Sequence, residues 1–132
     1  MIKNVVQFSA PALRLKELVG PSGKGLITIW LGHYPGARAK FRIRVELLRR
    51  IPQADWQKKQ FHHLADGLAE IKWTFDKKEF RAVGSYWRGF FTMLIGCIHK
   101  QGVYDPHGWL DIAKRRKREV ENERWATIDH EP

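Results

Sequence analysis

Cationic and imidazole side chains recur in the middle of this chain at positions that suit chemistry on a phosphate. Lys72 and Arg81 stand in two consecutive strand-like segments, and His99, Lys100 and His107 follow the next apolar segment. Cleavage of RNA by its own 2′-hydroxyl needs cations around the phosphorus, a group that takes a proton and a group that gives one. Arg and Lys supply the charge, while His, or a Lys crowded by other cations, can carry the proton. We therefore interpret these five side chains as candidate catalytic residues for RNA cleavage.

Three consecutive segments must position these side chains. Residues 68–75 and 80–86 alternate apolar with polar residues, which is the period of half-buried strands. Residues 90–98 are almost wholly apolar, as is typical of a strand covered on both faces. Asp76 and Lys77 form the first turn. The sequence therefore predicts three strands joined by tight turns, with basic side chains projecting from one face.

The length of the first turn decides what Lys72 and Arg81 face. An even loop places Trp73 opposite Phe80 and Lys72 opposite Arg81, whereas a one-residue slip would mix the core and solvent faces. Two cations directly opposite each other destabilise a strand pair. An anion bound between them would remove the repulsion; alternatively, both cations are solvated and Glu70 neutralises one of them. The sequence leaves these two interpretations open.

The charge of the chain indicates the kind of partner it meets. The 132 residues carry a formal net charge of +10, and residues 1–60 alone hold 12 Lys and Arg against 3 Asp and Glu. Such a balance favours a polyanionic partner, either nucleic acid or an acidic protein, over a neutral small molecule. The alternative is a merely solvated basic surface. The hydrophobic fraction of 43% and six Trp indicate a globular chain.

Several classes of function and location are disfavoured. Cys97 is the one cysteine, so no intrachain disulfide can form, and the longest apolar run is too short to span a bilayer. The N-terminus makes a poor signal peptide, so we expect a cytoplasmic protein with no membrane contact. The run GPSGKG lacks phosphate-loop spacing, and the six His lack zinc-ligand spacing. We expect no metal and no cofactor.

The other segments are expected to form the layers around this sheet. Among them, the segment over 37–51 is predicted to be a helix from its helical periodicity and its helix-favouring residues. The pattern predicts, in chain order, a strand or arm and a helical turn over 1–18, a buried strand over 26–31, a helix over 37–51, a short helix from Asp55 closed near Gly67, a loop over 99–108, a helix after Pro106, and a loose tail over 125–132.

Basic and aromatic side chains on the expected helices and loop are candidates for binding nucleic acid. The run KRRKR at 114–118 adds to the positive field, although such a run is usually a solvated helix face. The helix over 37–51 presents either a solvated basic face or a docking surface for phosphates or an acidic partner. The candidates are Arg38, Arg42, Arg49, Lys114, Arg115, Arg118, Tyr104 and Trp109.

Several motifs in order resemble the RelE/ParE toxin superfamily, and they are most similar to its phage-derived, HigB-like branch. The motifs are LADGLAEIK at 64–72, FRAV at 80–83, the apolar strand ending in IHK at 98–100, Pro106, and AKRR at 113–116. Lys72 and Arg81 match basic strand positions of the family, and Lys100 matches the first Lys of its basic pair. Gln101 stands where the second basic residue is usual, and Leu110 where RelE-like members carry a tyrosine.

The resemblance implies a fold, an activity and partners. It implies a small α+β fold in which N-terminal helices pack on a largely antiparallel sheet of about four strands, followed by a C-terminal helix. Residues 1–132 would form a single RelE-like domain, with an N-terminal extension over 1–25, a core over 26–120 and a tail over 121–132.

The implied activity is that of a toxin of a type II toxin–antitoxin system, an endoribonuclease (mRNA interferase) that cuts mRNA on the ribosome and is neutralised by a cognate acidic antitoxin. Two alternatives stay open. One is a phage or mobile-element accessory protein of the same fold that binds nucleic acid or protein without cleaving. The other is a ParE-like gyrase inhibitor.

Overall fold

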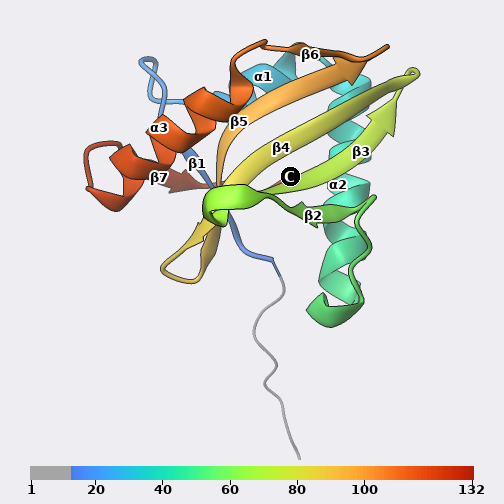
Figure 1. The fold of residues 1–132 in the computed structure, drawn as a ribbon, viewed down its shortest axis with the longest axis horizontal. Coiled ribbons are helices and arrows are strands. Elements are labelled where there is room, and N and C mark those ends of the chain that lie inside the picture. The colour runs from blue at the N-terminus through green and yellow to red at the C-terminus, as the bar shows by residue number, and fades with distance from the viewer. Residues whose placement is uncertain (1–12) are drawn as a thin grey trace, which may run out of the picture.

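The computed structural model describes residues 13–132, and the expectation for residues 1–12 lies outside them. The described chain is α+β, with three α-helices and a mixed seven-stranded sheet (Figure 1). The elements in order are β1 (Leu15–Leu18), α1 (Leu26–Gly32), α2 (Pro35–Arg50), the 3-10 turn η1 (Gln53–Asp55), β2 (Phe61–His63), the 3-10 turn η2 (Ala65–Gly67), β3 (Ala69–Phe75), β4 (Lys78–Trp87), β5 (Phe90–Lys100), β6 (Val103–Asp105), α3 (Trp109–Glu121) and β7 (Thr127–Asp129).

The sheet has the order β2-β3-β4-β5-β1-β7, and β6 pairs with the end of β5. β1 runs parallel to β5, and every other pair of strands is antiparallel. The long strands β3 and β4 are the two that the alternating pattern predicts, and β5 is the strand predicted from the apolar run over 90–98. Four short strands extend the sheet at its edges, so the expectation of about four strands was too low.

The predicted register of the β3–β4 hairpin is confirmed. Trp73 pairs with Phe80 and Lys72 with Arg81, and the apolar members of these pairs lie in one core cluster. Asp76 and Lys77 both have positive φ, at 52° and 61°. This is the geometry of a two-residue type I′ turn, whose twist matches that of the flanking strands.

The helices cover the two faces of the sheet unequally. α1 and α2 lie behind it, and α3 crosses the front over β4 and β5 (Figure 1). Phe41 and Val45 of α2 pack with Trp73 and Phe80 in the rear core, where the Trp73 indole donates a 3.0 Å hydrogen bond to the carbonyl of Ala37. On the front, Ala113 and Val120 of α3 close a second, smaller core. No helix among residues 13–132 is both long and apolar enough to cross a bilayer.

The prediction of a helix over 37–51 is confirmed by α2, but the buried strand expected over 26–31 is wrong, because these residues form α1. Only Ile27 and Leu31 are buried there, at the i, i+4 spacing of a helix face, and Ile29 is 37% exposed. A short apolar run does not distinguish a buried strand from a packed helix, and its β-branched residues favoured the wrong choice.

Four other local expectations were also wrong. Residues 15–18 form a strand instead of a helical turn, and the helix expected from Asp55 is replaced by η1, β2 and η2. The loop expected over 99–108 contains β6, and the expected loose tail over 125–132 contains β7, which pairs with β1. Each of these strands has three or four residues, too few for alternation to show, and each forms only because a longer strand offers it an edge.

A buried polar cluster fixes the C-terminal segment to the rest of the fold. The Glu17 carboxylate on β1 accepts hydrogen bonds from the backbone N–H of Thr28, at 2.8 Å, and from its hydroxyl, at 2.6 Å. The same carboxylate contacts Nδ1 of His130, just after β7, and Glu17 and His130 are only 1% and 7% exposed. The cluster therefore joins β1, α1 and the C-terminal segment.

We predict that Gly96→Ala will lower the free energy of unfolding by about 1–3 kcal/mol, the usual cost of overpacking. A Cβ at this position of β5 would lie 2.2 Å from the Trp30 ring, which packs directly on the glycine. Chemical denaturation will measure the loss. Gly32→Ala is the matched control, since no other group lies within 4 Å of a Cβ there. Equal stability of the two variants would contradict close packing of Trp30 on β5.

Candidate functional site

The candidate site lies on the front face of the sheet, beside the start of α3. Lys72 of β3 is opposite Arg81 of β4, Arg81 is opposite Cys97 of β5, and Glu79 is opposite His99. Residues that pair directly across antiparallel strands project from the same face. The strand register therefore brings three of the predicted site residues, Lys72, Arg81 and His99, to one face.

Two carboxylates hold the Arg81 guanidinium. Its Nε donates to Oε1 of Glu79 at 2.8 Å, and a terminal nitrogen lies 3.3 Å from Oε1 of Glu70. The Glu70 side chain is 1% exposed and that of Arg81 is 12% exposed. Burial lowers the pKa of Arg81, but the hydrogen bond to Glu79 and the charge of Glu70 outweigh burial and raise it. Arg81 is thus a fixed, permanently charged donor.

His99 stands between a carboxylate and an aromatic ring. Its Nδ1 lies 3.8 Å from Oε1 of Glu79, and its ring stacks on Tyr104 with centroids 4.3 Å apart and planes at 10°. The Tyr104 ring also lies under the Arg81 guanidinium, with its centroid 5.0 Å from Cζ, and packs against Trp109 with the two ring centroids 5.5 Å apart. The stack fixes the orientation of the imidazole, because a ring held between a partner charge and a second ring has little freedom to rotate.

The site holds carboxylates as well as the two cations Lys72 and Arg81, so its charges largely balance. Glu70 neutralises Arg81, as one of the two interpretations of the sequence expected, and Glu79 does so as well. The same interpretation took both cations as solvated, which is wrong for Arg81, whose side chain is 12% exposed. Glu70 additionally contacts Nδ1 of His62 at 3.2 Å. Two cations, Lys72 and Arg81, therefore face two carboxylates. No bound anion is needed to relieve their repulsion.

Glu79 is the functional candidate that sequence reasoning missed. Burial raises the pKa of its carboxyl, but the hydrogen bond and charge of Arg81, followed by the charges of Lys72 and His99, outweigh burial and lower the pKa. A signal was available in the sequence, since Glu79 and Glu70 stand two residues before Arg81 and Lys72. Strand alternation puts such neighbours on the same face.

Two of the predicted catalytic residues lie apart from this cluster. Lys100 follows His99 directly on β5, so strand alternation directs it to the opposite face, and it is exposed at the strand end. His107 is exposed in the turn before α3. The structure therefore groups Lys72, Arg81 and His99 with Tyr104 and Trp109, and it leaves Lys100 and His107 at the periphery.

The predicted basic surfaces occupy opposite faces of the molecule. On the front, Arg115 and Arg118 of α3 are exposed, whereas Lys114 pairs with Asp66 at 3.0 Å. Arg38 and Arg42 are exposed on α2, behind the sheet. Arg49, also on α2, donates from Nε to the carbonyl of Leu13 at 3.0 Å. Among these predicted basic residues of α2 and α3, those of α3 share a face with Arg81.

The remaining reactive groups do not suggest another chemistry. Burial is the largest of the effects that raise the pKa of the Cys97 thiol to about 12, with the charge of Glu70 next, so the thiol stays protonated near neutrality. A protonated, buried thiol is a poor nucleophile. Within residues 13–132, no three or more His, Cys, Asp or Glu side chains gather in a way that could hold a metal ion.

Comparisons of the chain with protein-family models, with curated proteins and with solved structures find no match.

Proposed function

We propose that this protein is an endoribonuclease that cuts RNA at the Arg81 cluster. The observation that carries the proposal is the arrangement of Glu79, Arg81 and His99 within one hydrogen-bonded and stacked group. A carboxylate, an imidazole and a guanidinium supply the three functions that transesterification of RNA needs: a proton acceptor, a proton donor and a stabiliser of phosphate charge.

The proposed reaction is attack of a ribose 2′-oxygen on the adjacent phosphorus. Glu79, ionised because its pKa is lowered, accepts the 2′-hydroxyl proton as the oxygen–phosphorus bond forms. The protonated imidazole of His99 gives a proton to the 5′-oxygen as its bond to phosphorus breaks. The products are a 2′,3′-cyclic phosphate and a free 5′-hydroxyl. Arg81 and Lys72 would stabilise the extra charge on the phosphate oxygens in the transition state.

The biological setting that we propose is a type II toxin of the RelE/ParE superfamily, similar to its HigB-like branch. The ordered motifs from 64–72 to 113–116 support this proposal, as does an α+β chain with two helices before the hairpin. Such a protein would cut mRNA on the ribosome, in the cytoplasm, and would be held inactive by an acidic antitoxin. Tyr104, which lies under Arg81, or Trp109, which packs against Tyr104, would take the place of the absent helix tyrosine in stacking on a base.

A second candidate is a protein of the same fold that binds nucleic acid or a protein partner without cleaving. The charge balance favours this candidate, because Glu70 and Glu79 already satisfy Arg81. A phosphate would have to compete with these carboxylates for the guanidinium. The two functions therefore differ in whether Arg81 can exchange a carboxylate for a phosphate.

Primer extension on a reporter mRNA during induced expression will test the proposal. We expect discrete new 5′ ends with the wild type and none with Glu79→Gln, a change that keeps the side-chain size. Lys24→Ala, an exposed cation of the loop before α1, is the matched control and should cleave normally. No new 5′ ends with the wild type would favour the binding protein, and growth arrest with intact mRNA and DNA damage would favour a gyrase inhibitor.

Binding of the protein to RNA should weaken steeply with salt. Each phosphate that Lys or Arg neutralises releases counterions, so the logarithm of the affinity falls linearly with the logarithm of the salt concentration. Arg115 and Arg118 on the front face predict a slope that becomes shallower by about one unit for each of them replaced by Gln. Filter binding from 50 to 200 mM salt, the range over which such effects are largest, will measure the slope. A flat dependence would show that the net charge of +10 is incidental.

A further inference from the structure

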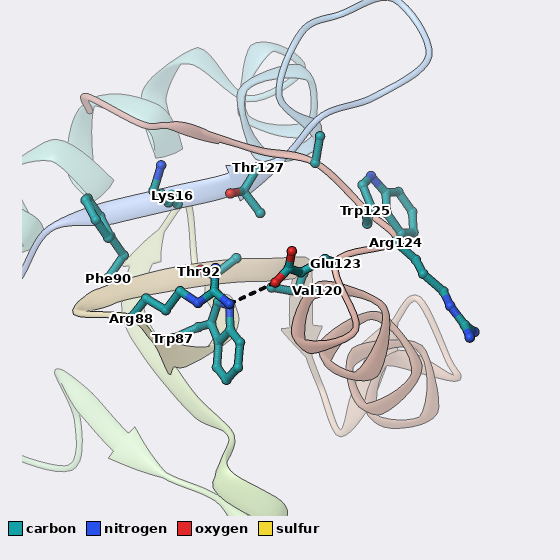
Figure 2. Close-up of a pocket in the computed structure, with 11 residues that line it drawn as sticks. Lys16, Trp87, Arg88, Phe90, Thr92, Val120, Glu123, Arg124, Trp125 and Thr127 are labelled. Atoms are coloured by element: carbon teal, nitrogen blue, oxygen red, sulfur yellow. Dashed lines mark hydrogen bonds and ion pairs between the residues drawn. The ribbon is translucent and has the colours of Figure 1, made fainter.

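A pocket of about 610 Å³ lies on the front face, beyond the C-terminal end of α3. It opens between the β4–β5 turn, β1 and the segment that leads into β7 (Figure 2). Its volume falls within the range of small-molecule and nucleotide sites. Thr92 of β5 and Lys16 of β1 are paired neighbours in its floor.

Aromatic rings and cations alternate around this pocket. Trp87 and Phe90 flank the Arg88-Gly89 turn of the β4–β5 hairpin, and Trp125 stands on the other side. The Phe90 ring lies under two cations, with Arg14 at 4.2 Å and Lys16 at 4.6 Å from its centroid. Stacking rings interleaved with cations are the recurrent means of holding single-stranded nucleic acid, since every base offers a π face and every nucleotide a phosphate.

The ion pairs of the pocket leave its charge positive. Arg88 pairs with Glu123 at 2.8 Å, and both side chains are 65% exposed. Lys16 pairs with Asp129, also at 2.8 Å. Exposed pairs of this kind contribute little to stability and can exchange partners readily. Arg14 lies over the Phe90 ring beside the pocket, is exposed, and pairs with no carboxylate within residues 13–132, so a phosphate next to Phe90 would meet an excess of cations.

The pocket and the Arg81 cluster share one face of the sheet. Trp87 and Trp125 pack against the same front core that contains Cys97, the neighbour of Arg81. Thr92 and Cys97 are five positions apart on β5, which is roughly 17 Å at the rise of a strand. α3 runs between the two sites and exposes Arg115 and Arg118. An RNA strand could therefore follow this helix from one site to the other.

We propose that the pocket binds an unpaired nucleotide of single-stranded RNA a few nucleotides away from the phosphate at Arg81. The base replaces the cations that lie over the Phe90 and Trp87 rings and stacks there, and Arg14 and Lys16 contact its phosphate instead. This inference rests on the proposed function, because it takes RNA as the ligand of the front face. It assigns the pocket to substrate binding and places it outside the reacting groups.

Fluorescence anisotropy with a labelled eight-nucleotide oligouridylate will test the inference. A 2′-O-methyl ribose prevents cleavage, because it removes the attacking hydroxyl. We expect Phe90→Leu, which keeps an apolar side chain of similar size, to weaken binding about five- to hundredfold, the range for loss of one stacked base. Tyr86→Leu is the matched control: this exposed aromatic of the same hairpin contacts Phe61 and Phe91 on the rear face, and its loss should leave binding unchanged.

Photocrosslinking separates this inference from the proposed function. We expect crosslinks of the oligouridylate to Trp87, Phe90 or Trp125, located by mass spectrometry, both in the wild type and in the Glu79→Gln variant. Crosslinks there in a protein that cuts no RNA would contradict the proposed nuclease activity and support nucleotide binding by the pocket. If Phe90→Leu leaves the rate and KM of RNA cleavage unaltered, and crosslinks form only near Arg81, nucleotide binding by the pocket would be contradicted and the nuclease activity would stand. Preferential binding of anionic vesicles or acidic peptides would also overturn it.

Discussion

Arg81→Ala is expected to lower RNA cleavage about a hundred- to a thousandfold, the usual effect of removing one stabiliser of transition-state charge. Arg81 offers paired donors, held in place by Glu79 and Glu70 and by the Tyr104 ring. Arg81→Lys should rescue little activity, because an ammonium cannot present the same two donors to a phosphate. Single-turnover cleavage of a defined RNA on ribosomes will measure the rate.

The Arg81→Ala variant needs a control for stability. Removing the guanidinium leaves Glu70 buried with only His62 as a partner, and an uncompensated buried charge is destabilising. The double variant Arg81→Ala with Glu70→Gln relieves that charge and should restore much of the stability without restoring cleavage. Wild-type cleavage by either variant would show that Arg81 has a structural role alone.

His130→Ala is expected to lower the free energy of unfolding by about 3 kcal/mol, at the lower end of the range for breaking a buried ion pair. His130 is the partner of Glu17 inside the cluster with Thr28, and its ring also lies 5.8 Å from that of Phe41. Its loss leaves the Glu17 carboxylate buried and partly unpaired. Urea denaturation will measure the change. Asp129→Asn, which breaks the more exposed pair with Lys16, should cost under about 1 kcal/mol.

The same cluster predicts that the free energy of unfolding falls when the protein is acidified. Burial is the largest single influence on the pKa of Glu17 and raises it, but the hydrogen bonds from His130 and Thr28 together outweigh burial and lower the pKa. The unfolded chain therefore binds this proton more readily than the folded chain does. The stabilisation is present above the ordinary carboxyl pKa, and it is lost as the pH falls through the lowered one.

Thermal unfolding between about pH 5 and pH 2, the range in which such carboxylates titrate, will measure this loss of stability. The wild type should lose stability on acidification more steeply than Glu17→Gln, which has no carboxyl to protonate at this position. Glu79 also has a lowered pKa and adds to the slope in both proteins, so the difference between them reports Glu17. Identical slopes would mean that the cluster stabilises the fold equally in either protonation state.

The central hairpin of this protein could be read from the sequence because its information is local. Alternation of apolar and polar residues over β3 and β4, with Asp76 and Lys77 between them, admits one register that keeps Trp73 and Phe80 in the core. The same alternation places Lys72 opposite Arg81. The helix α2 could be predicted for the same reason, since an apolar period that repeats over several turns outweighs the strand propensity of single residues.

The partners of those residues depended on contacts between distant segments. Glu79 and Glu70 neutralise Arg81, and Tyr104 reaches the site only because β6 folds back on β5. Lys100 and His107 stand close to His99 in sequence, yet the direction of the strand and the turn before α3 keep them outside the cluster. Side-chain direction at a strand end is decided by the pairing of the strand, which spacing alone does not specify.

The shortest elements were decided by tertiary structure alone. β1 and β7 have too few residues to show a period, and they form because β5 and then β1 offer unpaired edges. The contact between Glu17 and His130 joins residues 113 positions apart, and because the pair is buried, the loss of one partner costs more than the loss of an exposed pair would. The sequence by itself therefore determined the class of fold and the two cations of the candidate site. Only long-range packing decided which groups surround those cations and how the end of the chain is held.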